Sequence, residues 1–360
     1  HGVDPVVVGD PNAAVTRSKH CSEVVPAPSP SDDLRGYRDA LLAVAARPAV
    51  ETVVPLREPD AYVLAKSRDQ FAETVATPWP DFETMQAVQD RYELLGDADA
   101  LGIDIPRTEL LTEWQETDET TVVKSRYAIL ESDNETSYPG VRVVPPGEDI
   151  ARERTCEEFE HVPIAQEFVP GDTECGFFAL CDHGEAVATF QHRRVRSYGY
   201  DGGASVFRKS TRIPELTEAG TELLSALNWH GPAMVEFKRD PRDGSYKLME
   251  INPRFWGSLP LAVAAGVDFP RLYYRLALGD IPERPSYDTD VGCHLLRGEA
   301  SYLYSILRDE HEHVETPNFW REVAAVARSV LTHRNFDYLD TDDPRPFVSD
   351  TVGALWAQFG

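Results

Sequence analysis

The chain has 360 residues, of which 61 are Asp or Glu and 35 are Lys or Arg, so its formal net charge is −26. A nucleic-acid binder needs a basic stripe, and the densest basic cluster, HRRVR at 192–196, is too short to form a duplex-binding face. Only six of the basic residues are Lys, and this acidic, Lys-poor composition resembles that of proteins from salt-loving organisms.

Hydropathy and cysteine content narrow the class of protein further. Hydrophobic residues make up 42% of the chain, enough for a large core, and no apolar run is long enough to span a bilayer. The start carries no signal-peptide pattern, and the five cysteines include no C-x-x-C pair, so neither a disulfide framework nor a zinc site is expected. We expect a globular cytoplasmic protein of two or three structural units.

The first hundred residues alternate predicted strands and helices. Strands are expected at 5–9 and 51–56, and helices at 32–47, at 59–74 and within 84–105. This alternation is typical of βαβ units with a parallel sheet. Because the chain begins almost directly with a strand, we expect the first strand and most of the first helix of this domain to precede it.

The middle of the chain is expected to be mainly β-structure. The segment ETTVVKSRYAIL reads as a buried strand that carries Lys124, which is either a surface residue or an inward-facing phosphate contact. The polar stretch 131–149 is expected to be a mobile loop. Antiparallel strands are expected at about 163–169, 175–181 and 185–195. The QEFV segment is either an ordinary strand or a hinge whose backbone reads an adenine edge.

The sharpest pattern is MVEFKRDPRDGSYKLMEINPRFWGS, residues 234–258. Strand alternation puts Glu236 on one face with Lys238, and Glu250 on one face with Asn252. The PRDG turn predicts a hairpin in which the two glutamates lie nearly opposite each other. Facing carboxylates repel unless a cation lies between them, and with the amide oxygen of Asn252 they suit Mg²⁺. The alternative is that both carboxylates are simply solvated.

Arginines accompany this acidic pattern. Arg254 follows Asn252 by two residues, so on a continuing strand its guanidinium faces the same site, and the alternative is that it stacks on a neighbouring aromatic ring. Alternation also puts Arg194 and Arg196 on one strand face, either as a site for anions or as a solvated surface.

The last 75 residues, 286–360, are expected to be mostly helical. Three amphipathic stretches favour helices that pack on the body of the protein and are candidates for a homodimer contact. The HEH sequence at 311–313 lacks the i, i+4 spacing of metal ligands on a helix, so we interpret it as a solvated helix end.

Four segments carry a family resemblance in this order: VQDRYELLGDADALGIDIPRT, VVKSRY, IAQEFVPG and GPAMVEFKRDPRDGSYKLMEINPRFWGSLPLAVAAGVDFP. They resemble the ATP-grasp superfamily, specifically its carboxylate-amine ligase and carbamoyl-phosphate-synthase-like branch, over about residues 1–285. The resemblance implies a mixed α/β and α+β ATP-grasp fold. Its expected parts are a βαβ pre-ATP-grasp domain at 1–105, a lid subdomain at 106–167, an antiparallel catalytic lobe at 168–285 and a helical extension at 286–360.

The resemblance also implies how ATP and Mg²⁺ (or Mn²⁺) are bound. Glu236, Glu250 and Asn252 match the metal-binding positions, and Lys124 matches the strand lysine that contacts the α- and β-phosphates. Arg91 stands where the family usually has Lys, which keeps the charge and replaces a point donor by a planar fork.

The remaining nucleotide contacts follow from the same comparison. The residues that match the adenine-binding hinge are Gln166, Glu167, Phe168 and Val169. Glu174 or Asp172 is expected at the ribose, and Lys238 is a further nucleotide candidate. The phosphate flap departs from the family, because SRYAILESDNETSYPG has one Gly where many members have a glycine-rich loop.

The implied activity is an ATP-dependent ligation of a carboxylate to an amine, through an acyl phosphate, with release of ADP and phosphate. Arg254, Arg194 and Arg196 are the candidates for holding the substrate carboxylate or the acyl phosphate. Two alternatives stay open: a bicarbonate-using enzyme that forms carboxyphosphate, and a degenerate paralogue that binds ATP without ligation. The expected partners are small-molecule carboxylates and amines, and neither nucleic acid nor a membrane.

Overall fold

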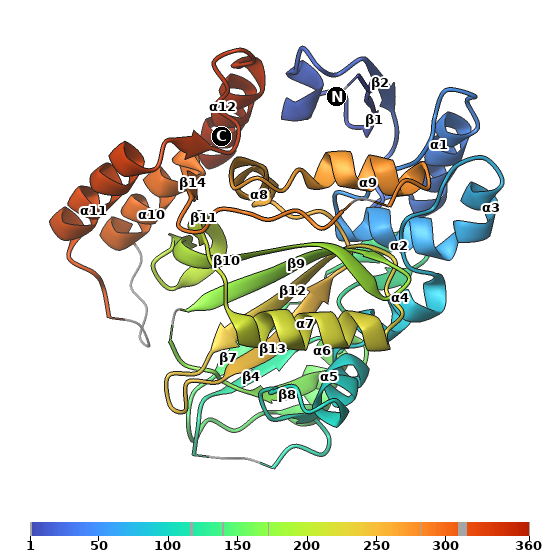
Figure 1. The fold of residues 1–360 in the computed structure, drawn as a ribbon. Helices are drawn as coiled ribbons and strands as arrows, with labels where there is room; N and C mark the ends of the chain where they lie inside the picture. Colours follow the sequence, from blue (N-terminus) through green and yellow to red (C-terminus); the bar gives the residue numbers. More distant parts are fainter. Residues whose placement is uncertain are drawn as a thin grey trace.

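The chain is built around one large, mainly antiparallel sheet (Figure 1). The computed structural model describes residues 2–115, 118–138, 140–171, 173–281, 283–308 and 315–359. Seven strands lie in the order β13-β12-β9-β10-β11-β14-β15, and only β14 and β15 pair in parallel. The strands are β9 (Glu174–Asp182), β10 (Glu185–Gly199), β11 (Gly202–Ser210), β12 (Gly231–Arg239), β13 (Tyr246–Asn252), β14 (Gly292–His294) and β15 (Asn335–Phe336).

Helices cover both faces of this sheet (Figure 1). Successive strand residues point to opposite faces, so Phe177 and Phe178, both fully buried, belong to two different cores. The covering helices are α5 (Arg91–Ala100) and α7 (Pro214–Ala226) on one face, and α8 (Leu259–Ala264) and α9 (Phe269–Ala277) on the other. Burial of each large apolar side chain contributes about 1.5–3 kcal/mol, which makes the sheet a rigid platform.

A smaller antiparallel sheet has the strand order β3-β8-β4-β7. Its strands are β3 (Thr108–Leu110), β4 (Thr121–Lys124), β7 (Val141–Val144) and β8 (Ile164–Glu167), and α6 (Arg152–Phe159) packs on it. Trp114 and Val123 lie in the core between this sheet and α6, together with partly buried Cys156 and Phe159. The strands predicted around Lys124 and the QEFV segment are therefore confirmed.

The expectation of a mobile loop over 131–149 is wrong. The chain instead forms the hairpin β5 (Leu130–Ser132) and β6 (Glu135–Ser137), followed by β7. Asp133 and Asn134 adopt the left-handed conformation (φ 50° and 73°), which is the geometry of a two-residue hairpin turn. The strands are short and polar, so their sequence resembles that of a loop.

The first hundred residues contain the predicted strand β1 (Val6–Gly9), which pairs in parallel with a strand that was not predicted, β2 (Glu23–Pro26), reached through a 3₁₀ helix, η1 (Ala14–Arg17). The helices are α1 (Leu34–Ala45), α2 (Glu58–Lys66), α3 (Arg68–Ala72) and α4 (Phe82–Gln89). The strand predicted at 51–56 is wrong, because only Thr52 forms a bridge, to Ala76. Pro55 has no amide hydrogen for a strand ladder, and the side chain of Leu56 is exposed.

The C-terminal part is mostly helical, as predicted, with α10 (Leu296–Arg308), α11 (Phe319–Thr332) and α12 (Arg345–Phe359). Its two short strands, β14 and β15, extend the large sheet and were not predicted. The HEH sequence lies outside the described residues. All five cysteines are free, as expected. Among the described residues, no helix has the length and apolar composition needed to cross a lipid bilayer.

A buried ion pair joins this C-terminal part to the large sheet. The Glu299 carboxylate in α10 accepts hydrogen bonds from Arg196 Nε (2.8 Å) and Nη2 (2.9 Å), and lies 2.6 Å from His294 Nδ1. Arg196 Nη2 also donates to Ser329 Oγ of α11 (2.5 Å). Burial opposes ionisation of Glu299, but His294 and Arg196 outweigh it and lower the pKa of this carboxyl.

We therefore predict that Glu299→Gln lowers the free energy of unfolding by about 3 kcal/mol, because it leaves the buried Arg196 charge uncompensated. Urea titration measures this loss. The control is Glu158→Gln, which breaks an exposed pair with Arg154 on α6 and is expected to change stability by less than about 0.5 kcal/mol. Equal, small effects in both variants would contradict the structural role of the pair.

Candidate functional site

Two glutamates face each other on the large sheet, as the sequence predicts. Glu236 on β12 is the register partner of Glu250 on β13. The Asn252 amide nitrogen lies 3.4 Å from Oε1 of each carboxylate. The turn that makes this possible is closed by Gly244, which has φ 83° and donates its N–H to the Asp240 carbonyl (2.8 Å). Three side chains with hard oxygen atoms therefore meet at one point.

The two carboxyl groups differ in their ionisation. Burial, reinforced by the charge of Glu250, raises the pKa of Glu236. For Glu250 burial acts in the same direction, but Arg91 and Lys124 outweigh it and lower the pKa. The Glu250 side chain keeps 34% of its exposure, so a diffusible cation can reach the pair.

Two cations approach this pair from outside the large sheet. Arg91, the first residue of α5, donates from Nη2 to Glu250 Oε2 (3.3 Å) and from Nη1 to the carbonyls of Ser125 (3.2 Å) and Tyr127 (3.1 Å). Lys124 ends β4 of the small sheet and is buried. Burial, together with the nearby Arg91, lowers the pKa of Lys124 to about 8. The small sheet thus contributes positive charge to the acidic pair.

Arg254 also lies at this point, although β13 ends at Asn252. Its Nη2 donates to Asn252 Oδ1 (3.1 Å) and to Glu58 Oε1 (3.2 Å), at the start of α2. Burial raises the pKa of Glu58, against the effect of Arg254. Over the part of the chain that the structure describes, no aromatic ring lies under the Arg254 guanidinium. The Arg254 guanidinium thus contacts Glu58 and Asn252, and its charge acts on the Glu236 carboxyl group.

The structure separates Arg194 from Arg196. Arg194 forms an ion pair with Glu174, and the charges of both residues act on the neighbouring Glu236 carboxyl. A β-bulge changes the register of β10 between the two arginines, so the alternation assumed from the sequence does not hold. Arg196 is buried against Glu299, and the two arginines do not share one site.

The hinge candidates follow the end of β8. Gln166 is buried and donates to Thr108 Oγ1 (2.8 Å). Burial opposes ionisation of Glu167, but its ion pair with Arg242 outweighs this and lowers the pKa. Phe168 is 38% exposed, and Lys238 Nζ lies 5.3 Å from the centroid of its ring.

Val169, the next residue in the chain, is buried. Because Arg242 and Lys247 already hold the Glu167 carboxylate, the side chain that this segment leaves open to a ligand is Phe168. Asp172, the second ribose candidate, lies outside the described residues.

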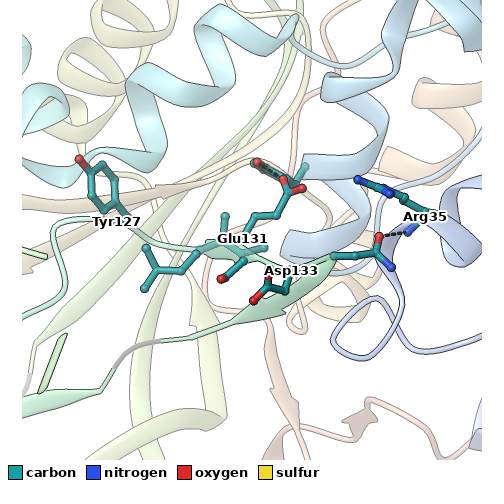
Figure 2. Close-up of a pocket in the computed structure, with 9 residues that line it drawn as sticks. Arg35, Tyr127, Glu131 and Asp133 are labelled. Atoms are coloured by element: carbon teal, nitrogen blue, oxygen red, sulfur yellow. Dashed lines mark hydrogen bonds between the residues drawn. The ribbon is translucent and has the colours of Figure 1, made fainter. Parts of the chain in front are cut away.

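A small cavity lies beside Glu250, and a larger one is lined by other residues. The smaller, about 10 Å³, has room for roughly one water molecule, and Glu58, Arg91, Glu250 and Asn252 are among its walls. The larger, about 720 Å³, lies along the hairpin β5–β6. Figure 2 shows Glu131 and Asp133 of the hairpin between Tyr127 and Arg35 in this larger cavity.

The hairpin at the position of the expected flap is fixed to the N-terminal helices. Asn134 donates from Nδ2 to Asp33 Oδ1 (2.7 Å), and its Oδ1 accepts the Arg35 N–H (2.9 Å). The Asn134 carbonyl accepts the Leu34 N–H (2.8 Å), so the hairpin tip satisfies amides in the first turn of α1. Glu131 accepts from Tyr62 Oη (2.6 Å) on α2. Sequence reasoning missed these residues because their partners lie far away in the chain.

Comparison with known proteins agrees with this geometry. Residues 162–296 match a family described as ATP-grasp in the biosynthetic pathway with Ter operon. No curated protein matches the chain. Pyruvate carboxylase from Rhizobium etli superposes with a TM-score of 0.60 at 17% identity, covering 81% of this chain and 28% of that one.

Two further solved structures are similar. L-amino acid ligase from Bacillus licheniformis has a TM-score of 0.53 and 20% identity, covering 72% of this chain and 64% of that one. The biotin carboxylase domain of the 2-oxoglutarate carboxylase from Hydrogenobacter thermophilus, solved as a dimer with MgADP, ADP and bicarbonate, has a TM-score of 0.59 and 14% identity, covering 80% and 66%. The chain thus spans 28% to 66% of the length of these proteins. The ATP-grasp resemblance and the predicted fold class are confirmed.

The fixed hairpin leads to a prediction about Asn134. Asn134→Gly preserves the left-handed backbone conformation but removes both side-chain hydrogen bonds, so amide hydrogen exchange over 130–137 should become faster and stability should fall by about 1 kcal/mol. Asp133→Gly is the matched control, since within the described residues the Asp133 side chain makes no hydrogen bond. Equal exchange in the two variants, measured by mass spectrometry, would show that Asn134 does not fix the hairpin.

Proposed function

We propose that this chain is an ATP-dependent ligase that joins a carboxylate to an amine through an acyl phosphate, releasing ADP and phosphate. The observation that carries the proposal is the facing pair Glu236 and Glu250, which Lys124 approaches from the small sheet and Arg91 from the start of α5. Burying two opposed carboxyl groups costs folding free energy, and a protein without catalytic activity would have no need for them. The four cationic groups that act on the pair are those of Arg91, Lys124, Arg194 and Arg254.

The donor set fits Mg²⁺. Two carboxylates and one amide oxygen are hard oxygen ligands, which Mg²⁺ prefers. In the structure Asn252 turns its amide nitrogen toward the carboxylates and its oxygen toward Arg254. A half-turn of this amide places the oxygen between the acids, so Glu236, Glu250 and Asn252 would hold the metal. Bound Mg²⁺ supplies positive charge that offsets the repulsion between ATP phosphates and an anionic acceptor.

The remaining nucleotide contacts come from elements around the metal set. Lys124, at the end of β4, would contact the α- and β-phosphates, and Arg91 would move its fork from Glu250 to a phosphate oxygen. The segment after β8 would receive the adenine against Phe168, with Lys238 beside it. Glu174 would bind the ribose through the carboxylate that now pairs with Arg194.

Arg254 and Arg194 would hold the acceptor. A carboxylate is a poor electrophile, because attack by an amine would have to expel an oxide, and phosphorylation turns that oxygen into a good leaving group. The acceptor carboxylate and the γ-phosphate are both anions, so a cation must hold them together. Arg254 lies on the Asn252 side of the pair, with Glu58 orienting its fork. Arg196 has no part in this proposal, because its guanidinium is buried against Glu299.

One comparison favours a second candidate. The biotin carboxylase domain that this fold resembles was solved in complex with MgADP, ADP and bicarbonate. A carboxyphosphate-forming enzyme would use the same metal set and the same arginines for a smaller acceptor. Dependence of ADP release on bicarbonate, in degassed buffer with and without added bicarbonate, distinguishes the two activities.

The test of the main proposal is ADP release with a panel of amino acids and other carboxylates. A ligase releases ADP faster when its substrates are present, whereas a degenerate ATP binder responds to ATP only by a thermal shift. We predict that Glu250→Gln lowers this turnover by at least about 100-fold, since outer-shell changes alone cost 10–100-fold at metal sites. Glu185→Gln, at the exposed start of β10, should leave turnover unchanged. Unchanged ADP release in the Glu250 variant at saturating Mg²⁺ would refute the assignment.

The Arg254→Lys variant distinguishes a role of Arg254 in binding ATP from a role in aligning the acceptor carboxylate. The change keeps the charge and removes the fork, so we expect about a 100-fold fall in kcat with little change in the Kd for ATP. Arg271→Lys, exposed on α9, is the control variant. If Arg254→Lys instead weakens ATP and keeps normal turnover at saturating ATP, Arg254 is a nucleotide ligand and the acceptor lies elsewhere.

A further inference from the structure

A second group of ligating side chains lies away from the acidic pair. β9 and β10 are joined by a tight turn in which His183 and Gly184 have φ values of 47° and 84°. The Gly184 N–H donates to the Trp229 carbonyl (2.7 Å), which holds the turn against the segment that enters β12. The turn lies six residues along β9 from Gly176, the partner of Glu236, or about 20 Å away at roughly 3.3 Å per residue.

The strand register brings His230 to this turn. Gly231 pairs with Cys181, so the residue before β12 lies beside the residue after Cys181. His230 Nδ1 is 3.4 Å from Asp182 Oδ1, and His183 Nε2 is 3.9 Å from the same oxygen. One ligating atom from each of the three residues lies within 4.8 Å of the other two. The two imidazole rings stack with centroids 4.2 Å apart.

The backbone at His230 is held firmly, which fixes one ligand in place. Gly231 has φ 96°, and a Cβ there would approach the Pro78 carbonyl oxygen to 2.1 Å, so only glycine fits. The His230 side chain is 15% exposed, whereas that of His183 is 64% exposed. The His230 imidazole is therefore held in place, whereas the exposed His183 imidazole can rotate toward a bound ion.

The protonation state suits a metal ligand. Burial, reinforced by the neighbouring His183, lowers the pKa of His230 to about 4. The groups that face this imidazole are His183, Asp182 and the more distant Arg68, whose charge acts in the same direction as burial. At neutral pH the His230 ring is therefore neutral and keeps the lone pair that a metal requires.

We propose that Asp182, His183 and His230 form a binding site for a divalent first-row transition metal of the Zn²⁺ class, separate from the nucleotide site. Bonds of about 2.0–2.2 Å in a tetrahedral site place ligand atoms roughly 3.3 Å apart. The separation of 3.4 Å between Asp182 and His230 already matches, and rotation of the exposed His183 ring would shorten its separations from both.

Metal binding at His230 Nδ1 replaces the weak hydrogen bond of 3.4 Å that this atom accepts from the His183 N–H. Two imidazoles and one carboxylate favour Zn²⁺, Ni²⁺ or Cu²⁺ over Mg²⁺ and Ca²⁺, unlike the all-oxygen set at Glu236. Solvent fills the remaining position. The bound ion links the β9–β10 turn to the start of β12, so it stabilises the folded chain by mass action.

Zn²⁺ binding to the whole chain, measured by isothermal titration calorimetry together with the melting temperature, tests the proposal. All proteins carry Glu250→Gln, because the acidic pair could itself bind added Zn²⁺. We expect one Zn²⁺ per chain and a higher melting temperature with Zn²⁺. His183→Ala alters a side chain that is 64% exposed, and it should weaken Zn²⁺ binding by at least about 10-fold. His230→Gln should do the same.

The matched control is His20→Ala, because His20 is an exposed histidine outside this cluster. It should leave the Zn²⁺ affinity unchanged. Absorption of bound Co²⁺ in the visible region provides a second readout, since a four-coordinate site with imidazole ligands gives an intense band that the His183 variant should lose. Zn²⁺ binding of equal strength in the His183, His230 and His20 variants, or no binding in the Glu250→Gln protein, would overturn the proposal.

Discussion

The repulsion between Glu236 and Glu250 is the constraint on which the arrangement of the site depends. Two carboxyl groups are brought face to face by a tight turn, and the protein offsets their charge with groups from several elements. Arg91 connects Glu250 to backbone carbonyls beside β4, so the large sheet and the small sheet meet at the acidic pair. A metal ion with bound phosphates would take over the neutralising role, and that exchange is the physical basis of the proposed activity.

The N-terminal helices take part in the same arrangement. Glu58 at the start of α2 holds Arg254, and the first turn of α1 is capped by the tip of the hairpin β5–β6. This hairpin lies where the phosphate flap was expected from the sequence. The large cavity along it is therefore shaped by Arg35 and Tyr62 as well as by the hairpin itself. The N-terminal helices thus contact both Arg254 and the hairpin.

Features of the site that depend on neighbouring residues could be predicted from the sequence. Features that depend on partners far away in the chain could not. The opposed glutamates could be predicted because the Pro-Arg-Asp-Gly turn and both strands lie within 20 residues of sequence, although the register shifts between Glu236 and Phe237. Arg196 could not be placed, because a bulge in β10 leaves no mark in the sequence and its partner Glu299 lies 103 residues away. The hairpin at 130–137 was missed because its strands are short and polar. The pairing of Asp182 with His230 follows only once β9 and β12 are known to be neighbours.

The measurement that tests the central claim most directly is anomalous diffraction from crystals soaked with Mn²⁺ and a non-hydrolysable ATP analogue. The account predicts a strong anomalous peak between the carboxylates of Glu236 and Glu250, with the phosphates of the analogue on the side of Lys124 and the base against Phe168. A nucleotide bound elsewhere, or a Mn²⁺ peak away from both glutamates while the analogue is fully occupied, would contradict it.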